Sequence, residues 1–278
     1  MSGSLAGGAA PSGTSAGGLT ALFREAGRPL LMPYAVGGYP DAEGCRRIVD
    51  CYRENGADII ELGIPFSDPL ADGPVIQGAS VVALKSGIRP ADVLDIARGA
   101  ADEGARLVLL SYLNTILAFK PERFFERCHE SGVLGVVVPD VPVEEAGDLQ
   151  ATARAHGVDV ILLAAPTSTD ERLARIAAAA SGFIYCVSTT GVTGARSALR
   201  QDLPDFIARL RRHTDLPLAV GFGVSTVEQA EAVAGFADGV IVGSALVDMV
   251  VRSKDLESGL AEVGRYLHQV RSTPSFSR

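Results

Sequence analysis

Residues 58–74 read DIIELGIPFSDPLADGP, an apolar run that ends in a carboxylate and continues into a loop rich in glycine and proline. Ile59 and Ile60 are typical of a buried strand, and Glu61 closes it. The loop carries two further acids, Asp68 and Asp72. Burying an anionic side chain directly after an apolar strand is costly unless it has a partner or a chemical role. The segment therefore predicts an acid–base site at the mouth of an α/β fold.

The composition limits the class of protein. The chain has 278 residues, 47% of them hydrophobic, and no apolar run approaches the roughly 20 residues that a membrane helix needs. Its 33 acidic and 25 basic residues give a net charge of −8, which argues against a nucleic-acid surface. The four cysteines show no C-x-x-C spacing and are typical of buried thiols in a reducing compartment. We expect a soluble cytoplasmic protein with no membrane or nucleic-acid partner.

From residue 19 onward, short apolar runs rich in β-branched residues alternate with segments of helical periodicity. Most of the runs are unbroken, as expected for parallel strands that are covered on both faces. Asn-Gly, Ser-Gly or His-Gly pairs at 55–56, 86–87, 131–132 and 156–157 are typical of helix ends. The eight predicted strands are Leu30–Val36, Asp58–Leu62, Arg106–Tyr112, Leu134–Pro139, Val158–Ala164, Gly182–Val187, Pro217–Val220 and Gly239–Val242.

Eight such units without a break in composition predict a single (β/α)8 TIM barrel over residues 19–271, with an extra helix at its N-terminal end. A doubly wound open sheet is the alternative, although the chain lacks a nucleotide-binding glycine fingerprint. Residues 1–18 are almost all Gly, Ser, Ala, Thr and Pro and predict a disordered extension. Residues 272–278 are expected to form a flexible C-terminal tail. Chemistry in such barrels lies at the carboxyl ends of the strands.

The last two strand ends predict a phosphate site. Gly223 follows the seventh strand and Gly243 follows the eighth. Glycine lets the backbone approach an anion, and helices that start at Ser225 and Ser244 would direct free N–H groups toward one point. Gly194 lies in the loop before them. The simpler alternative is that these glycines only form tight turns between strand and helix.

Both carboxylates have structural alternatives. Glu61 could form an ion pair, although Lys and Arg stand near no other strand end except Lys120 and Arg196 in loops. Asp72 could only form the turn of Ala-Asp-Gly-Pro, because Asp-Gly is a strong turn signal. All four histidines fall on predicted helices, so we expect no metal site, and no lysine lies in a strand for Schiff-base chemistry. A small phosphorylated substrate remains, lined by Tyr34, Leu110, Tyr112, Tyr185 and Phe222.

The sequence resembles the tryptophan synthase alpha subunit family over nearly everything from about residue 20 to 270. The most specific match is ELGIPFSDPLADGP at 61–74. Shorter matches are GVTG at 191–194, GFGVS at 221–225, VGSA at 242–245, DVP at 140–142 and YLN at 112–114. The resemblance implies a lyase that splits indole-3-glycerol phosphate into indole and glyceraldehyde 3-phosphate by a retro-aldol reaction, in the last steps of L-tryptophan biosynthesis.

The resemblance also implies roles for individual residues. Glu61 would be the general acid–base group at the glycerol hydroxyl and at indole C3, and Asp72 would interact with the indole N–H. Thr193, in the loop after the sixth strand, would hydrogen-bond Asp72 when that loop closes. The remaining substrate-binding residues would be Tyr34 and Leu110 beside the indole, Tyr185, Phe222, and the backbone of Gly194, Gly223, Gly243 and Ser244 at the phosphate.

A partner is implied as well. Members of the family pair with a beta subunit in an α2β2 heterotetramer, and the beta subunit carries pyridoxal phosphate, so no cofactor is expected in this chain. The residues that match the partner-facing loops are Pro65, Asp68, Pro69, Asn114 and Pro142. A free-standing lyase that releases indole, and a barrel that only activates a partner, are the alternatives.

Three features depart from the family pattern. The extension at 1–18 lies outside it. The first strand end has Tyr34 and then Gly-Gly-Tyr at 37–39, where a phenylalanine and a more apolar stretch are expected. The loop after the sixth strand reads GARSA at 194–198, which is not its commonest form. These differences leave the chemistry in place, whereas the resemblance leaves loop motion, partner coupling and substrate tolerance open.

Overall fold

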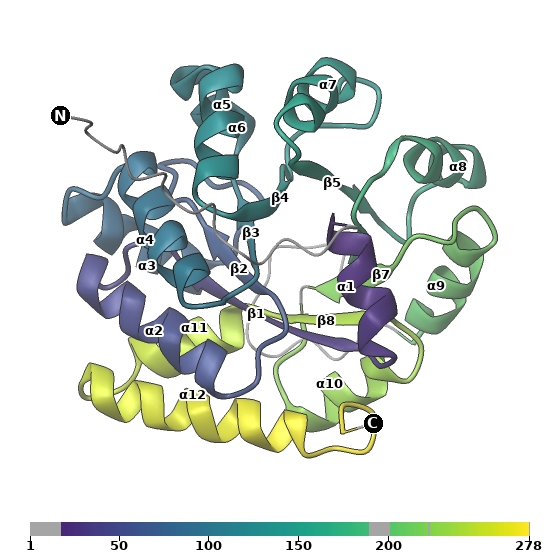
Figure 1. Cartoon of the computed structure of the whole chain (residues 1–278). Coiled ribbons are helices and arrows are strands. Elements are labelled where there is room, and N and C mark those ends of the chain that lie inside the picture. The colour runs from purple at the N-terminus through teal and green to yellow at the C-terminus, as the bar shows by residue number, and fades with distance from the viewer. Residues whose placement is uncertain (1–17, 189–200, 222, 278) are drawn as a thin grey trace, which may run out of the picture.

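The computed structural model describes residues 18–188, 201–221 and 223–277, and within them eight parallel strands form a closed barrel (Figure 1). Each strand pairs with the next, and the first pairs with the last. This closure confirms the predicted TIM barrel and excludes the doubly wound sheet. The strands are β1 (Leu30–Val36), β2 (Ile60–Gly63), β3 (Leu107–Leu110), β4 (Val133–Val137), β5 (Asp159–Ala164), β6 (Ile184–Val187), β7 (Leu218–Gly221) and β8 (Gly239–Val242).

Helices alternate with the strands and surround the barrel (Figure 1). At each of the four predicted helix ends a glycine with positive φ follows the last turn, which confirms those signals. The helices of the described residues are α1 (Gly18–Ala26), α2 (Ala42–Glu54), α3 (Pro74–Lys85), α4 (Pro90–Asp102), α5 (Leu113–Phe119), α6 (Pro121–Glu130), α7 (Gly147–Ala155), α8 (Asp170–Ala179), α9 (Leu203–Arg211), α10 (Val227–Ala234), α11 (Ser244–Val251) and α12 (Leu256–Arg271).

Side chains alternate between the two faces of each strand, and both faces are buried. On β1, Met32 and Tyr34 belong to the cluster inside the barrel, whereas Leu31 and Ala35 belong to the cluster between the barrel and the helices. This double burial accounts for the unbroken apolar runs in the sequence. Tyr34 is the register partner of Glu61 on β2, so both side chains share the inward direction.

The extra N-terminal helix α1 covers the end of the barrel opposite the carboxyl ends of the strands. The Phe23 and Phe183 rings lie 5.5 Å apart between centroids. A Cβ on Gly135 of β4 would lie 2.7 Å from Leu19 Cδ1, so the helix approaches the strand closely only because this position is glycine. The apolar face of α1 therefore completes the barrel interior at this end.

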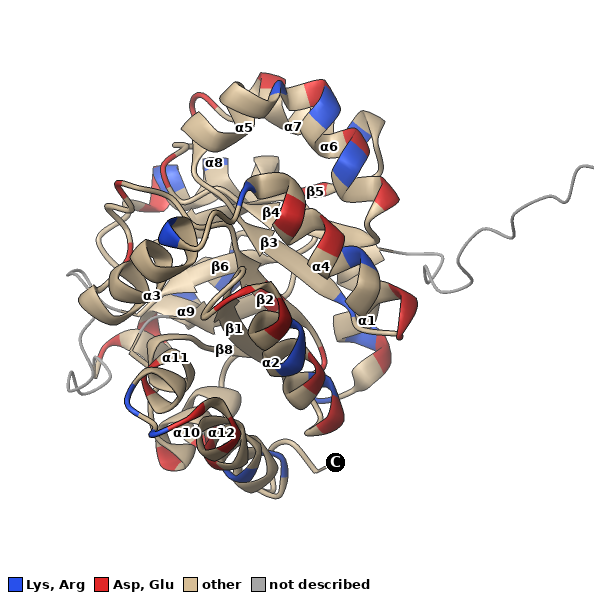
Figure 2. Ribbon diagram, turned by 90° about the vertical axis from the view of Figure 1, so that its left-hand side faces the viewer, with Lys and Arg blue, Asp and Glu red and all other residues tan. Residues whose placement is uncertain are grey.

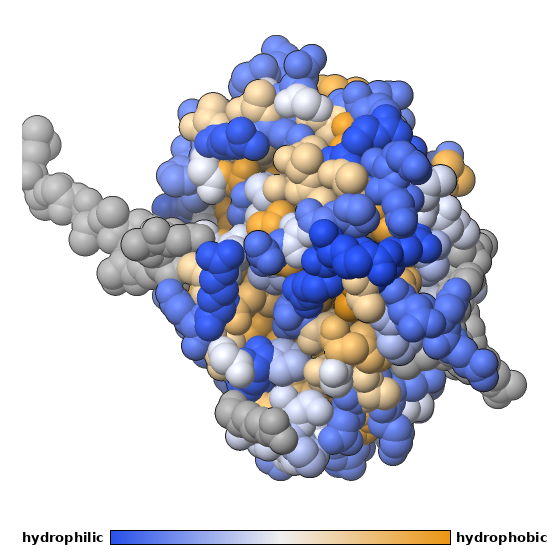
Figure 3. Space-filling model, turned by 90° about the vertical axis from the view of Figure 1, so that its right-hand side faces the viewer, coloured by the Kyte–Doolittle hydropathy of each residue, from blue (hydrophilic) through white to orange (hydrophobic). Residues whose placement is uncertain are grey.

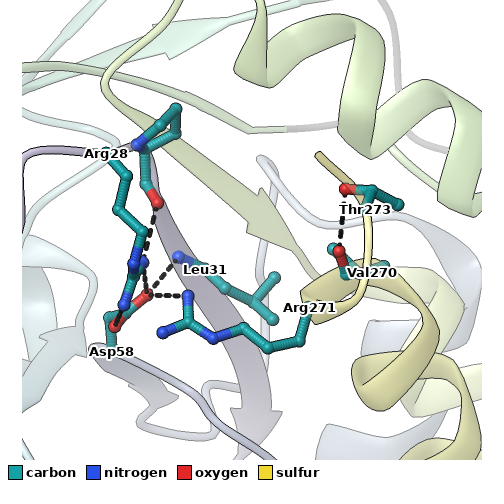
Figure 4. A network of polar contacts seen from close by, with 7 residues as sticks. Arg28, Leu31, Asp58, Val270, Arg271 and Thr273 are labelled. Atoms are coloured by element: carbon teal, nitrogen blue, oxygen red, sulfur yellow. Dashed lines mark hydrogen bonds and ion pairs between the residues drawn. The ribbon is translucent and has the colours of Figure 1, made fainter. Parts of the chain in front are cut away.

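An ion-pair network joins the two ends of the barrel sequence near α1 (Figure 4). Arg28 donates to Asp58 through Nη2 at 2.8 Å and Nη1 at 2.9 Å. Asp58 Oδ2 also accepts from the Leu31 N–H at 2.8 Å and from Arg271 Nη1 at 3.2 Å. Beyond α12, the chain turns back and buries Phe276, which is 1% exposed. The segment that the sequence predicts as a flexible tail is therefore anchored by a core side chain.

The outer surface is polar. Charged residues lie mainly on the outer helices and loops (Figure 2). One side of the molecule shows hydrophilic residues with smaller apolar patches between them (Figure 3). Of the helices in the described segments, none is both long and apolar enough to cross a membrane. All four cysteines are free thiols, and three of them are buried.

Candidate active site

A cavity that both carboxylates line lies at the carboxyl ends of the strands. This is the end of a TIM barrel that carries active sites. The described residues that line it come from five strands, from the loop between β2 and α3, from α3 itself, from the turns after β7 and β8, and from the start of α11. They are Tyr34, Glu61, Asp72, Ile76, Leu110, Tyr185, Gly223, Ile241, Gly243 and Ser244.

Glu61 projects from β2 into this cavity and is 2% exposed. Its Oε1 atom has no hydrogen-bond partner, and it forms no ion pair with any described residue. Burial, with a further contribution from the charge of Asp72, raises the pKa of Glu61 from 4.5 to about 8. The described residues therefore do not support the ion-pair alternative, and at neutral pH Glu61 is a protonated acid that can give up its proton.

Asp72 faces the same cavity and is 5% exposed. Its backbone N–H donates to Pro69 O at 3.0 Å, so it also forms the turn that the sequence suggests. Burial raises the pKa of Asp72 to about 6, and a hydrogen bond from Tyr112 opposes part of that increase. The turn places the carboxylate, and its environment leaves it mostly ionised at neutral pH beside a protonated Glu61.

Tyr112 connects the end of β3 to the loop that carries Asp72. Its hydroxyl donates to the Asp72 carboxylate and accepts the Ala71 N–H at 3.0 Å. Its ring stacks on Phe66 with 5.2 Å between centroids. The sequence predicts Tyr112 only as a lining residue, and the structure gives it a positioning contact instead, because the loop folds over it from about 40 residues earlier in the chain.

The turn after β8 leads directly into α11, an eight-residue helix. Gly243 is its N-cap and has no side chain, so no cap occupies the first N–H groups of the helix. Ser244 begins the helix as predicted, and both residues line the cavity. A short helix after the eighth strand with a free N-terminus is a typical phosphate site in TIM barrels.

The turn after β7 is different from the prediction. The helix α10 begins at Val227 and not at Ser225. Thr226 caps it, and Gln229 Oε1 accepts from the backbone N–H of Ser225 at 2.8 Å and of Thr226 at 3.3 Å. These two donors are therefore occupied within the chain. Gly223, with φ of 87°, remains at the cavity wall. Among the described residues, the free N–H groups at the predicted anion site are therefore those at the start of α11.

Two tyrosines lie across neighbouring strands where glycine leaves room for them. A Cβ on Gly63 of β2 would lie 2.1 Å from Tyr34 Oη, and a Cβ on Gly221 of β7 would lie 2.2 Å from Tyr185 Oη. No larger residue fits at either glycine without moving the phenol. Burial and the nearby carboxylates raise the pKa of both tyrosines, so both hydroxyls stay protonated.

The histidines lie away from the cavity. His129 and His268 are in α6 and α12, His156 ends α7, and His213 follows α9. Among the residues that the structure describes, no three or more His, Cys, Asp and Glu side chains are arranged to hold a metal. Of the described residues that line the cavity, Glu61 and Asp72 are the two with carboxyl groups.

Comparison with known proteins identifies the family. A sequence model described as tryptophan synthase alpha chain matches residues 20–273. The chain belongs to the tryptophan synthase alpha chain family. The tryptophan synthase alpha chain of Dehalococcoides mccartyi is 46% identical over 247 residues, which cover 88% of this chain and 95% of that protein. The tryptophan synthase alpha chain of a Roseiflexus species is 47% identical over 232 residues, covering 83% and 89% respectively.

Solved tryptophan synthase structures share the fold. A chain of Mycobacterium tuberculosis tryptophan synthase superposes with a TM-score of 0.85 at 38% identity, covering 93% of this chain and all of that one. A chain of the α2β2 complex from Pyrococcus furiosus superposes with a TM-score of 0.82 at 34% identity, covering 88% and 99%. The barrel is therefore the fold seen in these tryptophan synthase chains.

Some residues that the tryptophan synthase resemblance implies cannot be placed in the cavity. Thr193, Gly194 and Phe222 lie outside the described residues. In contrast, Ile76 and Ile241 line the cavity although the sequence does not predict them. Ile241 could have been found by alternation, since it lies two positions before Gly243 on the same strand face. Ile76 gives no such signal, because only the packing of α3 brings it to the barrel mouth.

The five residues that match the partner-facing loops of tryptophan synthase differ in exposure. Asp68 and Asn114 are exposed, Pro142 is half-buried, and Pro65 and Pro69 are buried within this chain. The two buried prolines shape the loop and offer little surface to a partner. Leu70, between the two carboxylates of this loop, is 81% exposed. A large apolar side chain that is exposed beside polar candidate contact residues is typical of a surface that binds a partner.

Proposed function

We propose that this chain cleaves indole-3-glycerol phosphate into indole and glyceraldehyde 3-phosphate. The observation that carries the proposal is a buried acid without an ion-pair partner, Glu61, in one cavity with Asp72 and with the free N-terminus of α11. Membership of the tryptophan synthase alpha chain family supports the same reaction. The cavity offers one end for an anion and the other for a ring that must change its charge during the reaction.

The phosphate group anchors the substrate at a point distant from the C–C bond that breaks. Backbone N–H groups at the start of α11 and the positive end of its dipole would bind the phosphate beside Gly243 and Ser244. The glycerol chain then directs the indole toward Glu61 and Asp72. Binding energy spent at the phosphate in this way positions the reacting carbon atoms.

Glu61 transfers protons in both steps. Its carboxylic acid gives a proton to indole C3, and this converts the ring into an electron sink. The resulting carboxylate takes the proton of the hydroxyl on the neighbouring side-chain carbon while the bond from C3 to that carbon breaks. The electron pair of the bond returns to the ring, the carbon becomes the aldehyde of glyceraldehyde 3-phosphate, and the acid is restored. A pKa raised to about 8 suits a group that must act as both acid and base near neutral pH.

Asp72 stabilises the charge that this protonation creates. When C3 gains a proton, the indole N–H becomes cationic. An ionised carboxylate in a buried site interacts with such a charge more strongly than it would in water. Tyr112 holds the Asp72 carboxylate through its hydroxyl, and the turn from Pro69 fixes the backbone. Two acids with different pKa values thereby take two different roles.

Turnover of indole-3-glycerol phosphate tests the proposal directly. The purified chain is assayed for release of indole and glyceraldehyde 3-phosphate, alone and with a tryptophan synthase beta subunit. We expect equal amounts of both products and a large increase with the beta subunit. Glu61→Gln should lose cleavage but still bind a glycerol phosphate analogue, whereas Glu145→Gln, an exposed control, should keep both. No cleavage under either condition refutes the proposal, and fast cleavage without a response to the beta subunit indicates a free-standing lyase.

The partner that we propose is a tryptophan synthase beta subunit, in an α2β2 assembly that receives the indole. Asp68 and Asn114 with the apolar Leu70 form an exposed edge at the carboxyl end of the barrel. An exposed leucine flanked by polar residues is typical of a contact site. Leu70→Ser should therefore weaken the complex, measured as the concentration of beta subunit that gives half-maximal activation. Val82→Ser changes a comparably apolar exposed residue on α3 and serves as the control.

We place no cofactor in this chain. The described lining of the cavity includes no lysine, so it offers no amine to form a Schiff base with pyridoxal phosphate. Under this proposal pyridoxal phosphate belongs to the beta subunit, and both proton transfers described above use side chains alone. A cytoplasmic location stays a prediction, which fractionation of cells that express the chain at its natural level would test.

A further inference from the structure

Tyr34 presents a hydroxyl group to the cavity from the end of β1. The residue lines the cavity and is 5% exposed. Its ring lies across β2, because a Cβ on Gly63 would lie only 2.1 Å from Tyr34 Oη. The hydroxyl therefore lies against the backbone of β2 at the cavity wall, in the space that a side chain at Gly63 would fill.

This hydroxyl makes no hydrogen bond with any residue that the structure describes. Other phenols near it are satisfied. Tyr112 both donates and accepts, and Tyr52 donates to the backbone oxygen of Tyr34 at 2.9 Å. Buried polar groups are nearly always hydrogen-bonded, so one that faces a ligand cavity without a partner is free to bind the ligand.

The position of Tyr34 shows which part of the substrate its hydroxyl meets. The Cβ end of the side chain lies near the turn after β8, where the phosphate would bind, since a Cβ on Gly243 would lie 3.7 Å from Tyr34 Cβ. The hydroxyl end lies over the strand that carries Glu61, and the charge of Asp72 is the strongest single charge acting on the pKa of Tyr34. The side chain therefore runs from the phosphate end to the carboxylate end of the cavity, where the indole would bind.

We propose that Tyr34 is a specificity-determining residue that favours an indole ring with a hydroxyl substituent on its six-membered ring. The inference rests on the proposed function and goes further by naming a substrate class. An unsubstituted ring that displaces water from the cavity leaves the Tyr34 hydroxyl buried and unpaired, and a ring hydroxyl restores its hydrogen bond. Pairing this buried hydroxyl instead of leaving it unpaired corresponds to a preference of about 5- to 150-fold for the hydroxylated ring over the unsubstituted ring.

The reverse reaction gives a direct test. Indole, or indole hydroxylated at carbon 4, 5, 6 or 7, is condensed with glyceraldehyde 3-phosphate by the wild-type chain, by Tyr34→Phe and by Tyr266→Phe. The last variant is the matched control, because Tyr266 Oη is also buried without a partner but lies in α12 outside the cavity lining. For each ring, kcat/KM is divided by the value for indole.

We expect the ratio for at least one hydroxyindole to fall about 5- to 150-fold in Tyr34→Phe and to change less than twofold in Tyr266→Phe. Binding gives a second readout, independent of turnover, since the chain has no tryptophan and the fluorescence of each indole can be titrated without a background from tryptophan. The same ring should lose affinity in Tyr34→Phe. Normal condensation of indole with ratios and affinities unchanged in Tyr34→Phe overturns this inference alone. A wild-type chain that condenses no indole overturns the proposed function and this inference together.

Discussion

Replacing Glu61 by glutamine should remove catalysis and at the same time stabilise the folded chain at alkaline pH. The side chain is 2% exposed, and burial raises its pKa from 4.5 to about 8. Because the folded-state pKa exceeds that of the unfolded chain, the unfolded chain loses its proton first as pH rises. The contribution of Glu61 to stability is therefore fully present below its pKa in the unfolded chain. It is lost progressively as the pH rises through its pKa in the folded chain.

The magnitude follows from the two pKa values. Each pH unit between 4.5 and about 8 lowers the free energy of unfolding by about 1.4 kcal/mol through this one group. The loss reaches about 3 kcal/mol at pH 7 and about 5 kcal/mol above pH 8. Glutamine has a similar shape and no charge at any pH. The difference in stability between Glu61→Gln and the wild type should therefore be small at pH 5 and should grow to several kcal/mol at pH 9.

Urea denaturation of both chains at pH 5, 7 and 9 measures this difference, with Glu145→Gln as an exposed control that should follow the wild type at every pH. Cleavage by Glu61→Gln should fall by at least about 100-fold, because an amide cannot transfer the proton. Curves of stability against pH that run parallel for Glu61→Gln and the wild type would refute the buried, unpaired acid. Near-normal cleavage would refute its role as the proton-transfer group.

Cleavage requires ionised Asp72 and protonated Glu61, so kcat/KM should rise through a pKa of about 6 and fall through about 8, and a flat profile from pH 5 to 9 contradicts this pairing. Tyr112→Phe removes the hydrogen bond that lowers the pKa of Asp72, so the acidic limb should move to higher pH and kcat should fall about tenfold. An acidic limb at the wild-type position would show that the bond has no such effect. Asp58→Ala leaves Arg28 and Arg271 without their shared carboxylate and should lower stability by about 3 kcal/mol in urea denaturation, while kcat of the folded chain stays within twofold. A large loss of kcat would mean that the network also shapes the active site.

The barrel could be predicted from the sequence because its signals are local. The bounds of β1 and β8 match the structure residue for residue, since an unbroken apolar run and the flanking turns delimit each of them. The third predicted strand is too long, because it includes Tyr112, which leaves the sheet to cap α5. Glycine after four helices marks the turns correctly. Each of these features depends on a few neighbouring residues and needs no knowledge of distant contacts.

The details of the site depend on choices that the sequence leaves open. Ser225 and Thr226 each precede a Glu or Gln by three positions, so both could form the capping box of α10. In the structure Thr226 forms the capping box with Gln229. The Gln229 side chain therefore accepts hydrogen bonds from backbone N–H groups that the sequence assigns to the anion. The contact between Tyr112 and Asp72 joins residues 40 positions apart, and no periodicity predicts it. Sequence patterns thus locate the strand ends, whereas hydrogen bonds across loops decide which donors remain free.

Two acids on β2 and just before it, Asp58 and Glu61, show how residues that stabilise the fold are separated from residues that act on the substrate. Asp58, just before β2, is held by two arginines and a backbone N–H at the closed end of the barrel. Glu61, three residues later, is buried at the open end with no cation and with an oxygen that has no partner. The first arrangement stabilises the fold through its ion pairs, whereas the second disfavours the charged form of Glu61 and keeps a proton available. A cation beside Glu61 would stabilise its carboxylate and lower its pKa, so the acid would no longer hold the proton that C–C bond cleavage requires. The absence of such a cation among the described residues is therefore what the proposed chemistry needs.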